Sequence, residues 1–216
     1  MPRNQLIEAS PLSKQKSKSA KAKAAICEAT IDCLVEVGYG KTSLNLVAAQ
    51  AGFSKGALQH HFHSKEDLII ATANRLLQRT VNAPIRSSSH SSLSSSHSTQ
   101  TVSTAILFLW NKLVNTPPYR ALLEILTAAR TDVALRKRVS HTLQEWNTAL
   151  NEQAIATYYS REGDEEVRQL MSMTRNFLGG LIIHERHGRK SSESLKQVKK
   201  WITLIEPKLK LRTEKN

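Results

Sequence analysis

The sequence is poor in residues that form tight turns, favour strands or cross-link the chain. Its 216 residues include only 8 Gly, 6 Pro and 2 Cys, and aromatic residues make up 5%. This scarcity argues against an all-β sandwich and favours a helical protein. The two cysteines, Cys27 and Cys33, do not have metal-site spacing and fit a reducing compartment, so we expect a cytoplasmic protein.

Long apolar runs are also missing. No stretch approaches the roughly 18 apolar residues that a membrane-spanning helix needs, so we predict no contact with a membrane interior. The first 23 residues carry Lys and Arg without an apolar segment, so they do not resemble a secretory signal. The apolar fraction of 40% is typical of globular proteins, and the chain is long enough to bury a substantial core.

Acidic residues are outnumbered by basic ones. The sequence has 31 Lys plus Arg against 18 Asp plus Glu, a net charge of +13, which points to an anionic partner. The excess is uneven: residues 1–23 hold six basic residues and one acidic, residues 24–80 hold five of each, and residues 186–216 hold ten and three. Total charge therefore cannot show which part of the chain binds such a partner.

The N-terminal part of the chain has the pattern of a helix-turn-helix. Residues 1–20 are polar, and we expect a flexible basic arm that could contact DNA phosphates. A helix is predicted from Lys21 to a stop at Gly38, followed by short helices over 44–51 and from Ser54 to about His61, and another from Ser64 to about Gln78. The two short helices are joined by Gly52, Phe53 and Ser54, which suits a helix-turn-helix. We assign this domain to residues 21–80.

Residues 81–216 read as a larger helical domain. A Ser- and His-rich segment, residues 86–100, is predicted to be a mobile loop because it has little to bury. Five further apolar stripes predict helices around 106–113 and 122–129, from Asp132 to about Ser160, and over 165–186 and 195–205. The expected fold is all-α, with about nine helices and no strand.

The segment from Thr42 to Leu68 resembles the DNA-binding signature of TetR-family regulators. The matching elements occur in the family's order and spacing: Val47-Ala48, Ala51-Gly52, Ser54-Lys55-Gly56, His61-Phe62 and Ser64-Lys65-Glu66-Asp67-Leu68. The resemblance implies a homodimer that binds double-stranded DNA through this domain and a small-molecule effector through the C-terminal helices. Two positions depart from the family pattern: Gln59 stands where a Tyr is usual, and Leu46 where a polar residue is usual.

The second helix of a helix-turn-helix enters the major groove, and this assigns the candidate DNA contacts. Leu58 and Phe62 are expected in the core, which leaves Lys55, Ala57, Gln59 and His60 for the groove. Gly56 would allow close approach of the backbone to DNA. Thr42, Ser43, Ser54 and Lys65 are candidates for phosphate contacts near helix starts.

The resemblance places the effector pocket and the dimer contacts in the C-terminal helices. Large, adaptable apolar side chains are the pocket candidates: Trp110, Leu113, Leu122, Ile125, Leu126, Trp146, Leu150, Met171 and Met173. The predicted dimer contacts lie on the last two helices, where Gly179 and Gly180 would let a partner helix approach: Thr174, Phe177, Leu178, Leu181, Val198, Ile202 and Ile205. An ordinary intramolecular core explains the same apolar pattern equally well.

The expected function is transcriptional repression. The dimer would bind a palindromic operator and leave it when a small-molecule ligand binds. Alternatives are a ligand-independent DNA-binding protein, an activator of the same fold or, less favoured, a helical enzyme. No catalytic or nucleotide-binding motif supports an enzyme, and no cofactor is predicted. The pairs His184/His187 and His90/His97 lack a third ligand, so we predict no metal site.

Overall fold

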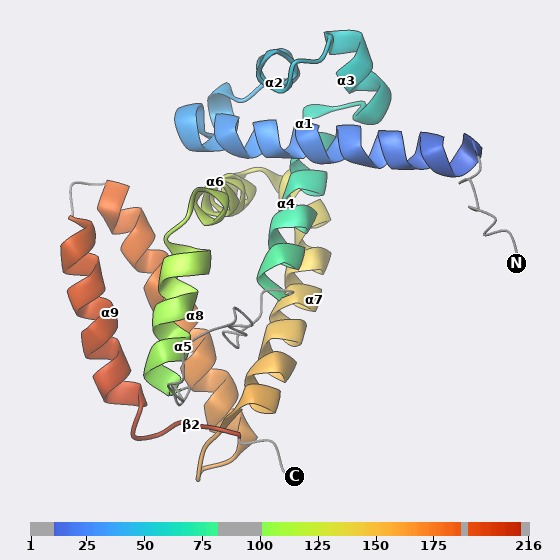
Figure 1. Cartoon of the computed structure of the whole chain (residues 1–216). Coiled ribbons are helices and arrows are strands. Elements are labelled where there is room, and N and C mark those ends of the chain that lie inside the picture. The colour runs from blue at the N-terminus through green and yellow to red at the C-terminus, as the bar shows by residue number, and fades with distance from the viewer. Residues whose placement is uncertain (1–10, 82–100, 187–189, 213–216) are drawn as a thin grey trace, which may run out of the picture. The chain divides into compact units, whose positions relative to one another are not determined.

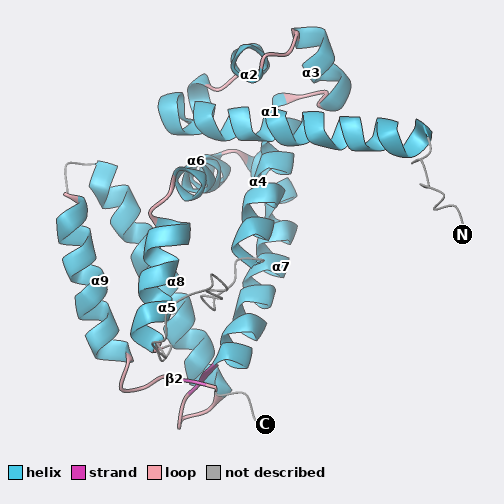
Figure 2. Cartoon of the chain, viewed as in Figure 1, coloured by secondary structure: helices cyan, strands magenta, loops and turns pink. Residues whose placement is uncertain are grey.

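The computed structural model describes residues 11–81, 101–186 and 190–212, and within these ranges the chain is helical apart from short connections (Figures 1 and 2). Nine α-helices, one π-helical segment and two very short strands make up the described residues, which confirms the all-α prediction. The chain divides into two compact units, residues 1–72 and 73–216. Helix α4 (Lys65–Val81) contributes to both units, because its first half belongs to one and its second half to the other.

The N-terminal unit is built from α1 (Pro11–Lys41), α2 (Leu44–Ala51), α3 (Lys55–His61) and the start of α4. Side-chain caps set the starts of the short helices: the hydroxyl of Ser43 accepts the Leu46 N–H, and that of Ser54 accepts the Ala57 N–H. Gly52 ends α2 in the left-handed conformation, with φ 70°. A shared core holds the helices together, formed mainly by Ile26, Cys33, Val47, Ala48, Leu58, Phe62 and Leu68.

The expected flexible arm is wrong from residue 11 onward, because α1 begins at Pro11 and not at Lys21. Proline suits the first turn of a helix, and no Gly or Pro interrupts the chain between Pro11 and Gly38. The predicted stop at Gly38 is present as a break in α1, where this residue has φ 76° and ψ 171°. Residues 1–10 lie outside the described residues.

The second unit contains the end of α4 and the helices α5 (Val102–Phe108), α6 (Pro117–Thr131), α7 (Val133–Thr157), α8 (Asp164–Arg186) and α9 (Ser191–Ile205). Helix α5 continues into the π-helical segment η1 (Leu109–Val114), and the Asn115 N–H bonds the Trp110 carbonyl at 2.8 Å. The predicted loop over 86–100 lies outside the described residues. All five predicted helices are present, and α9 stops just before Pro207 as expected.

Two short strands were not predicted. β1 (Tyr158–Tyr159) follows α7 and pairs antiparallel with β2 (Lys210–Leu211), so α7 ends at Thr157 and not near Ser160. Arg212 holds the pair in place, because its Nε donates to the carbonyls of Ile155 at 2.7 Å and Tyr158 at 3.0 Å. The C-terminal segment is thereby fixed beside the end of α7.

Candidate DNA-binding surface and ligand pocket

Helix α3 presents a continuous exposed face. Its buried side is Leu58, with Phe62 directly after the helix; these residues are 0% and 6% exposed. The remaining side of the helix is open to solvent, and it carries the predicted groove residues Lys55, Gly56, Ala57, Gln59 and His60. A Cβ added at Gly56 would meet nothing within 4 Å. The structure thus places these five residues where DNA could reach them.

Two serines at helix starts lie on the same unit's surface. Ser43 and Ser54 are exposed, and each hydroxyl oxygen accepts a backbone N–H, at 3.2 Å from Leu46 and 3.1 Å from Ala57. A hydroxyl that accepts in this way still has its own O–H to donate. Each serine can therefore cap its helix and donate to a phosphate oxygen at the same time.

Two predicted phosphate contacts are corrected by the structure. Thr42 is only 2% exposed, and its hydroxyl donates to the Gly38 carbonyl at 2.8 Å, so it faces the protein. Lys65 is half-buried; its ammonium donates to the Tyr39 carbonyl at 2.7 Å and lies 4.3 Å from the centre of the Tyr39 ring. Through these contacts, Lys65 links α4 to the end of α1. The sequence could not show this, because Lys65 and Tyr39 are far apart along the chain.

The histidines that end α3 stack on each other. The ring centres of His60 and His61 are 5.4 Å apart with an angle of 13° between the ring planes. Burial, then the neighbouring His60 and Lys23, lower the pKa of His61. His61 therefore stays uncharged at neutral pH, which agrees with packing at the helix end.

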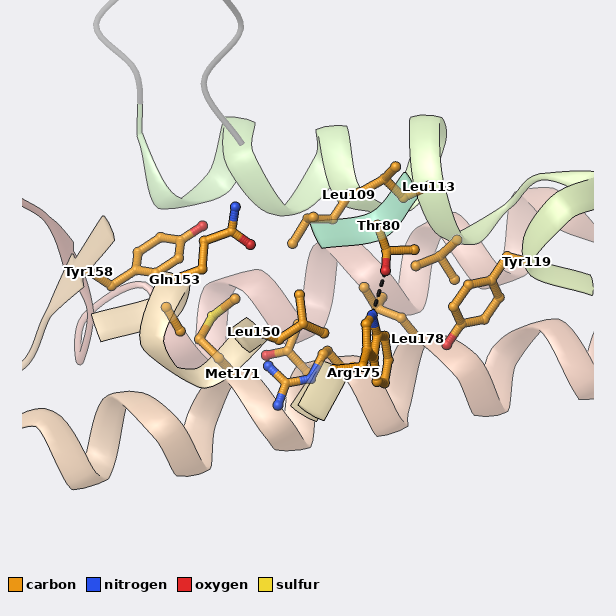
Figure 3. A pocket seen from close by; sticks show the side chains of 14 residues that line it. Thr80, Leu109, Leu113, Tyr119, Leu150, Gln153, Tyr158, Met171, Arg175 and Leu178 are labelled. Atoms are coloured by element: carbon orange, nitrogen blue, oxygen red, sulfur yellow. Dashed lines mark hydrogen bonds between the residues drawn. The ribbon is translucent and has the colours of Figure 1, made fainter. Parts of the chain in front are cut away.

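The second unit encloses an apolar cavity of about 80 Å³ between the end of α4, η1, α6, α7, β1 and α8 (Figure 3). Four of the predicted ligand-contacting residues line it: Leu113, Trp146, Leu150 and Met171. The other lining residues are Thr80, Leu109, Val114, Tyr119, Gln153, Ala154, Tyr158, Thr174, Arg175 and Leu178. The widened turn of η1 supplies one wall of the cavity.

Five predicted ligand contacts lie elsewhere. Trp110 and Ile125 are 1% and 0% exposed and do not line the cavity, and Leu126 does not line it either. Leu122 borders a neighbouring hollow of about 260 Å³. Met173 is 53% exposed, because it follows Met171 by two residues and so points to the opposite side of α8.

Six polar residues of the cavity were not predicted as ligand contacts: Thr80, Tyr119, Gln153, Tyr158, Thr174 and Arg175. Arg175 lies four residues after Met171 and three before Leu178, which both line the cavity, so helical spacing was a usable signal. The predicted set contains apolar side chains only, and a charged residue falls outside it. Tyr119 is half-buried, and its hydroxyl would lie 2.9 Å from a Cβ placed at Gly179. Gly179 thus makes room for Tyr119 and not for a partner helix.

Most of the predicted dimer contacts are corrected. Leu178, Leu181, Val198, Ile202 and Ile205 are buried within the single chain, in the core where α5, α8 and α9 pack together. Thr174 is also buried: its hydroxyl donates to the Leu170 carbonyl at 2.7 Å and accepts the indole N–H of Trp201 at 2.9 Å. Phe177 is half-buried against Trp201, with ring centres 5.3 Å apart.

A different apolar surface is open on the same two helices. Met173 and Ile183 on α8 are 53% and 47% exposed, and Leu204 on α9 is 56% exposed. Gly180 lies between the first two, and a Cβ there would meet nothing within 4 Å. Met173, Gly180 and Ile183 share one face of α8 by their helical spacing.

No group of three His, Cys, Asp or Glu residues in the described part of the chain could hold a metal ion. His184 is exposed, whereas His90, His97 and His187 lie outside the described residues. Both cysteines are buried and free of a disulfide. Burial, together with Glu36 and Asp32, raises the pKa of Cys33, so its thiol stays protonated. Among the described helices, none combines the length and apolar character needed to cross a membrane.

Comparison with known proteins agrees with these features. The profile of bacterial regulatory proteins of the tetR family matches residues 26–72. An uncharacterized HTH-type transcriptional regulator of Mycobacterium tuberculosis is 26% identical over 171 residues, covering 78% of this chain and 85% of the relative.

Solved structures of regulators share the fold. A TetR-family regulator from Cytophaga hutchinsonii has a TM-score of 0.62 at 20% identity, covering 88% of this chain and 96% of that one. A transcriptional regulator from Saccharomonospora viridis, solved in complex with choline, has a TM-score of 0.59 at 16% identity, covering 89% of this chain and 100% of the other. The profile match identifies residues 26–72 as a DNA-binding domain of the tetR-family type, and the solved regulators share the fold of the chain.

Proposed function

We propose that this protein is a homodimeric repressor that binds a palindromic DNA operator and leaves it when a small molecule enters the C-terminal cavity. The exposed face of α3 is the observation that carries the proposal. This helix is capped by Ser54 and anchored by Leu58, and all the residues on its open side are small, polar or basic.

The side chains on that face suit the edges of bases in the major groove. An amide such as that of Gln59 can bond adenine in a bidentate manner, and Lys55 can bond guanine or a phosphate. The methyl group of Ala57 can contact a thymine methyl group. The exposed hydroxyls of Ser43 and Ser54 supply backbone contacts that fix the helix in the groove.

Helix α4 offers a route from the cavity to the DNA-binding unit, because it is continuous through residues of both units. Its last turn is tied to α7: the indole of Trp146 donates to the Thr80 hydroxyl, and the amide of Gln153 donates to the Val81 carbonyl at 3.3 Å. Thr80, Trp146 and Gln153 also line the cavity. A ligand that repositions them would shift the population toward a state with α4 in another position.

A small-molecule effector is supported by a structural neighbour, since the Saccharomonospora viridis regulator was solved in complex with choline. Dimer formation would use the exposed surface of Met173, Gly180, Ile183 and Leu204. A two-fold dimer reads two half-sites whose centres lie about 34–36 Å apart, or a multiple of that distance.

Footprinting on the DNA upstream of the protein's own gene tests the proposal. We expect protection of a palindrome, and we expect the double variant Lys55→Ala/Gln59→Ala to lose it while keeping the wild-type melting temperature. Lys199→Ala, an exposed lysine of α9, is the matched control and should protect the same bases. Equal affinity of the wild type for the upstream DNA and for scrambled DNA would refute sequence-specific repression.

A further inference from the structure

Several polar groups of the cavity are already satisfied within the protein. The hydroxyl of Thr80 donates to the Leu77 carbonyl at 2.7 Å and accepts from the Trp146 indole. Thr174 donates to the backbone of its own helix and accepts from the Trp201 indole at 2.9 Å. These groups need no ligand to complete their hydrogen bonds.

Two buried polar atoms at one end of the cavity have no hydrogen-bond partner among the described residues: the hydroxyl of Tyr158 and the Oε1 atom of Gln153. Tyr158 is 0% exposed, and burial raises its pKa to about 12, so its hydroxyl remains a donor at any physiological pH. The amide of Gln153 is oriented by its bond to the Val81 carbonyl. Figure 3 shows the two side chains at the same end of the cavity, with the Tyr158 hydroxyl directed toward the Gln153 amide.

Unpartnered buried polar atoms are rare in native proteins and costly to keep. A ligand group that both accepts and donates would satisfy the two atoms together. It would accept the Tyr158 O–H and donate to Oε1 of Gln153. A hydroxyl group meets both requirements, whereas a methyl group or an ether meets neither or only one.

The cavity also contains one cation and no anion. The guanidinium of Arg175 donates to Oδ1 of Asn151 at 2.8 Å, and no Asp or Glu lines the cavity. Burial lowers the pKa of Arg175, and the nearby Tyr119 opposes this effect. A guanidinium remains charged nevertheless, and half-burial of Arg175 without an Asp or Glu in the cavity lining favours an anionic ligand group beside it.

We propose that the effector is a compact organic acid with an apolar body and a hydroxyl group. Its carboxylate pairs with Arg175, its hydroxyl lies between Tyr158 and Gln153, and its apolar body contacts Leu113, Leu150 and Met171. This inference rests on the proposed function, because it names the ligand class of the same cavity. The positive charge of Arg175 opposes quaternary ammonium ligands such as choline.

The size of the cavity favours a small ligand. Its volume of about 80 Å³ is below the roughly 150 Å³ of an apolar cavity that holds benzene. Tyr119 borders both this cavity and the hollow of about 260 Å³ beside it. Movement of the Tyr119 ring would therefore join the two spaces and admit a ligand with one aromatic ring.

Calorimetry with the full-length protein tests the ligand class. The probes are 4-hydroxybenzoate, 4-hydroxyphenylacetate and 4-hydroxycinnamate, which differ in length, each compared with its primary amide and with the acid lacking the hydroxyl. We expect at least one hydroxy acid to bind about tenfold more tightly than either analogue, the loss expected for one hydrogen bond to a charged or buried group. Choline should not bind. The proposal is overturned if no hydroxy acid binds at millimolar concentration, or if the amides or choline bind more tightly.

Two variants assign the contacts. Arg175→Gln should weaken binding of the acid about tenfold or more and leave binding of its amide unchanged, which shows that the cavity is intact. Tyr158→Phe should bind the hydroxy acid no better than the acid without the hydroxyl. Arg168→Gln, on the same helix but outside the cavity lining, should behave as the wild type. Unchanged affinity of Arg175→Gln for the acid would contradict the assigned role of Arg175.

Footprinting separates this inference from the proposed function. The acid that binds should release the wild type from its operator and should fail to release Arg175→Gln. If the protein protects an operator and no acid releases it, the inferred ligand class is overturned, whereas the proposed operator binding still stands. Absence of operator protection would refute the repressor, while calorimetry would still decide which ligand class the cavity binds.

Discussion

At the residue scale, burial divides the TetR signature into positions that build the domain and positions that can meet DNA. Leu58 and Phe62 belong to the core, and Thr42 and Lys65 are held by backbone carbonyls of α1. Ser54 and Gly56 remain on the open face of α3. Polarity alone is therefore a poor guide to DNA contact, because Thr42 and Lys65 are polar and serve the fold.

At Gly56, the effect of a substitution on stability can be separated from its effect on operator affinity. A methyl group at this position meets no protein atom within 4 Å, and alanine stabilises a helix by about 0.5–1 kcal/mol relative to glycine. We therefore expect Gly56→Ala to raise the melting temperature slightly. If the backbone of α3 approaches DNA closely, the same methyl group should cost about tenfold in operator affinity, comparable to one base contact of about 1–3 kcal/mol.

Thermal melts and fluorescence anisotropy with labelled operator DNA measure the two effects. Gly40→Ala is the matched control, because Gly40 also has open surroundings but lies outside α3. Its operator affinity should equal that of the wild type. A Gly56→Ala variant with higher stability and undiminished affinity would show that α3 does not approach DNA at this point.

At the scale of elements, the sequence predicted a helix end correctly wherever the residues next to that end determine its position. Serine caps and Gly52 predicted α2 and α3 correctly, because these signals act within one turn. The start of α1 was missed because its first turns carry no apolar stripe, and helix propensity with Pro11 sets the boundary instead. Strands of two residues are too short to show any alternation.

Contacts between distant elements were less predictable. Apolar spacing on α8 and α9 showed that Leu178 and Val198 would be buried, but it could not show that their own chain buries them. The cavity was predicted only in part. Leu113 and Trp146 were expected from their size, whereas Arg175 was missed because the predicted set contained apolar side chains only, although it shares a helix face with Met171.

The helical start of α1 changes what the basic N-terminal segment can do. Lys16, Lys18 and Lys21 are exposed on this helix. A helix holds them at fixed positions, so each can bind a defined phosphate group. Replacing all three with alanine preserves the helix, because alanine is the best helix former. We expect the dependence of log K on log salt concentration to flatten by about 0.9 for each DNA phosphate that the variant no longer neutralises.

Anisotropy titrations at several salt concentrations measure this slope. The matched control replaces Lys196, Lys199 and Lys200 of α9 with alanine. These lysines are also exposed, and their replacement removes the same charge. The control should keep the wild-type slope, since its lysines lie in the other unit. Equal slopes for the α1 variant and the wild type would show that the basic turns of α1 do not contact DNA.

At the scale of the whole molecule, the net charge of +13 says little about recognition. Residues 24–80, which contain the entire helix-turn-helix, have five residues of each sign and no net charge. Specific recognition must therefore come from a few placed side chains on α3, with nonspecific attraction supplied from outside this segment. A single α3 contacts few base pairs, so the proposed function depends on pairing two copies of the chain.

The exposed surface of Met173, Gly180, Ile183 and Leu204 is where we expect that pairing. Leu204→Glu would place a charge in an apolar interface, and burying an unpaired carboxylate is strongly unfavourable. We expect the variant to be a monomer by light scattering and to keep its helical circular dichroism, because Leu204 is already 56% exposed in the single chain.

A monomer reads one half-site, so its operator affinity should fall by about 10²–10⁴-fold, the usual gain from two linked binding sites. Lys199→Glu introduces the same residue on another side of α9, and it should remain dimeric with near wild-type affinity. A Leu204→Glu protein that stays dimeric would place the interface elsewhere. A monomer that binds the palindrome as tightly as the wild type would instead refute paired recognition, because one α3 would then suffice.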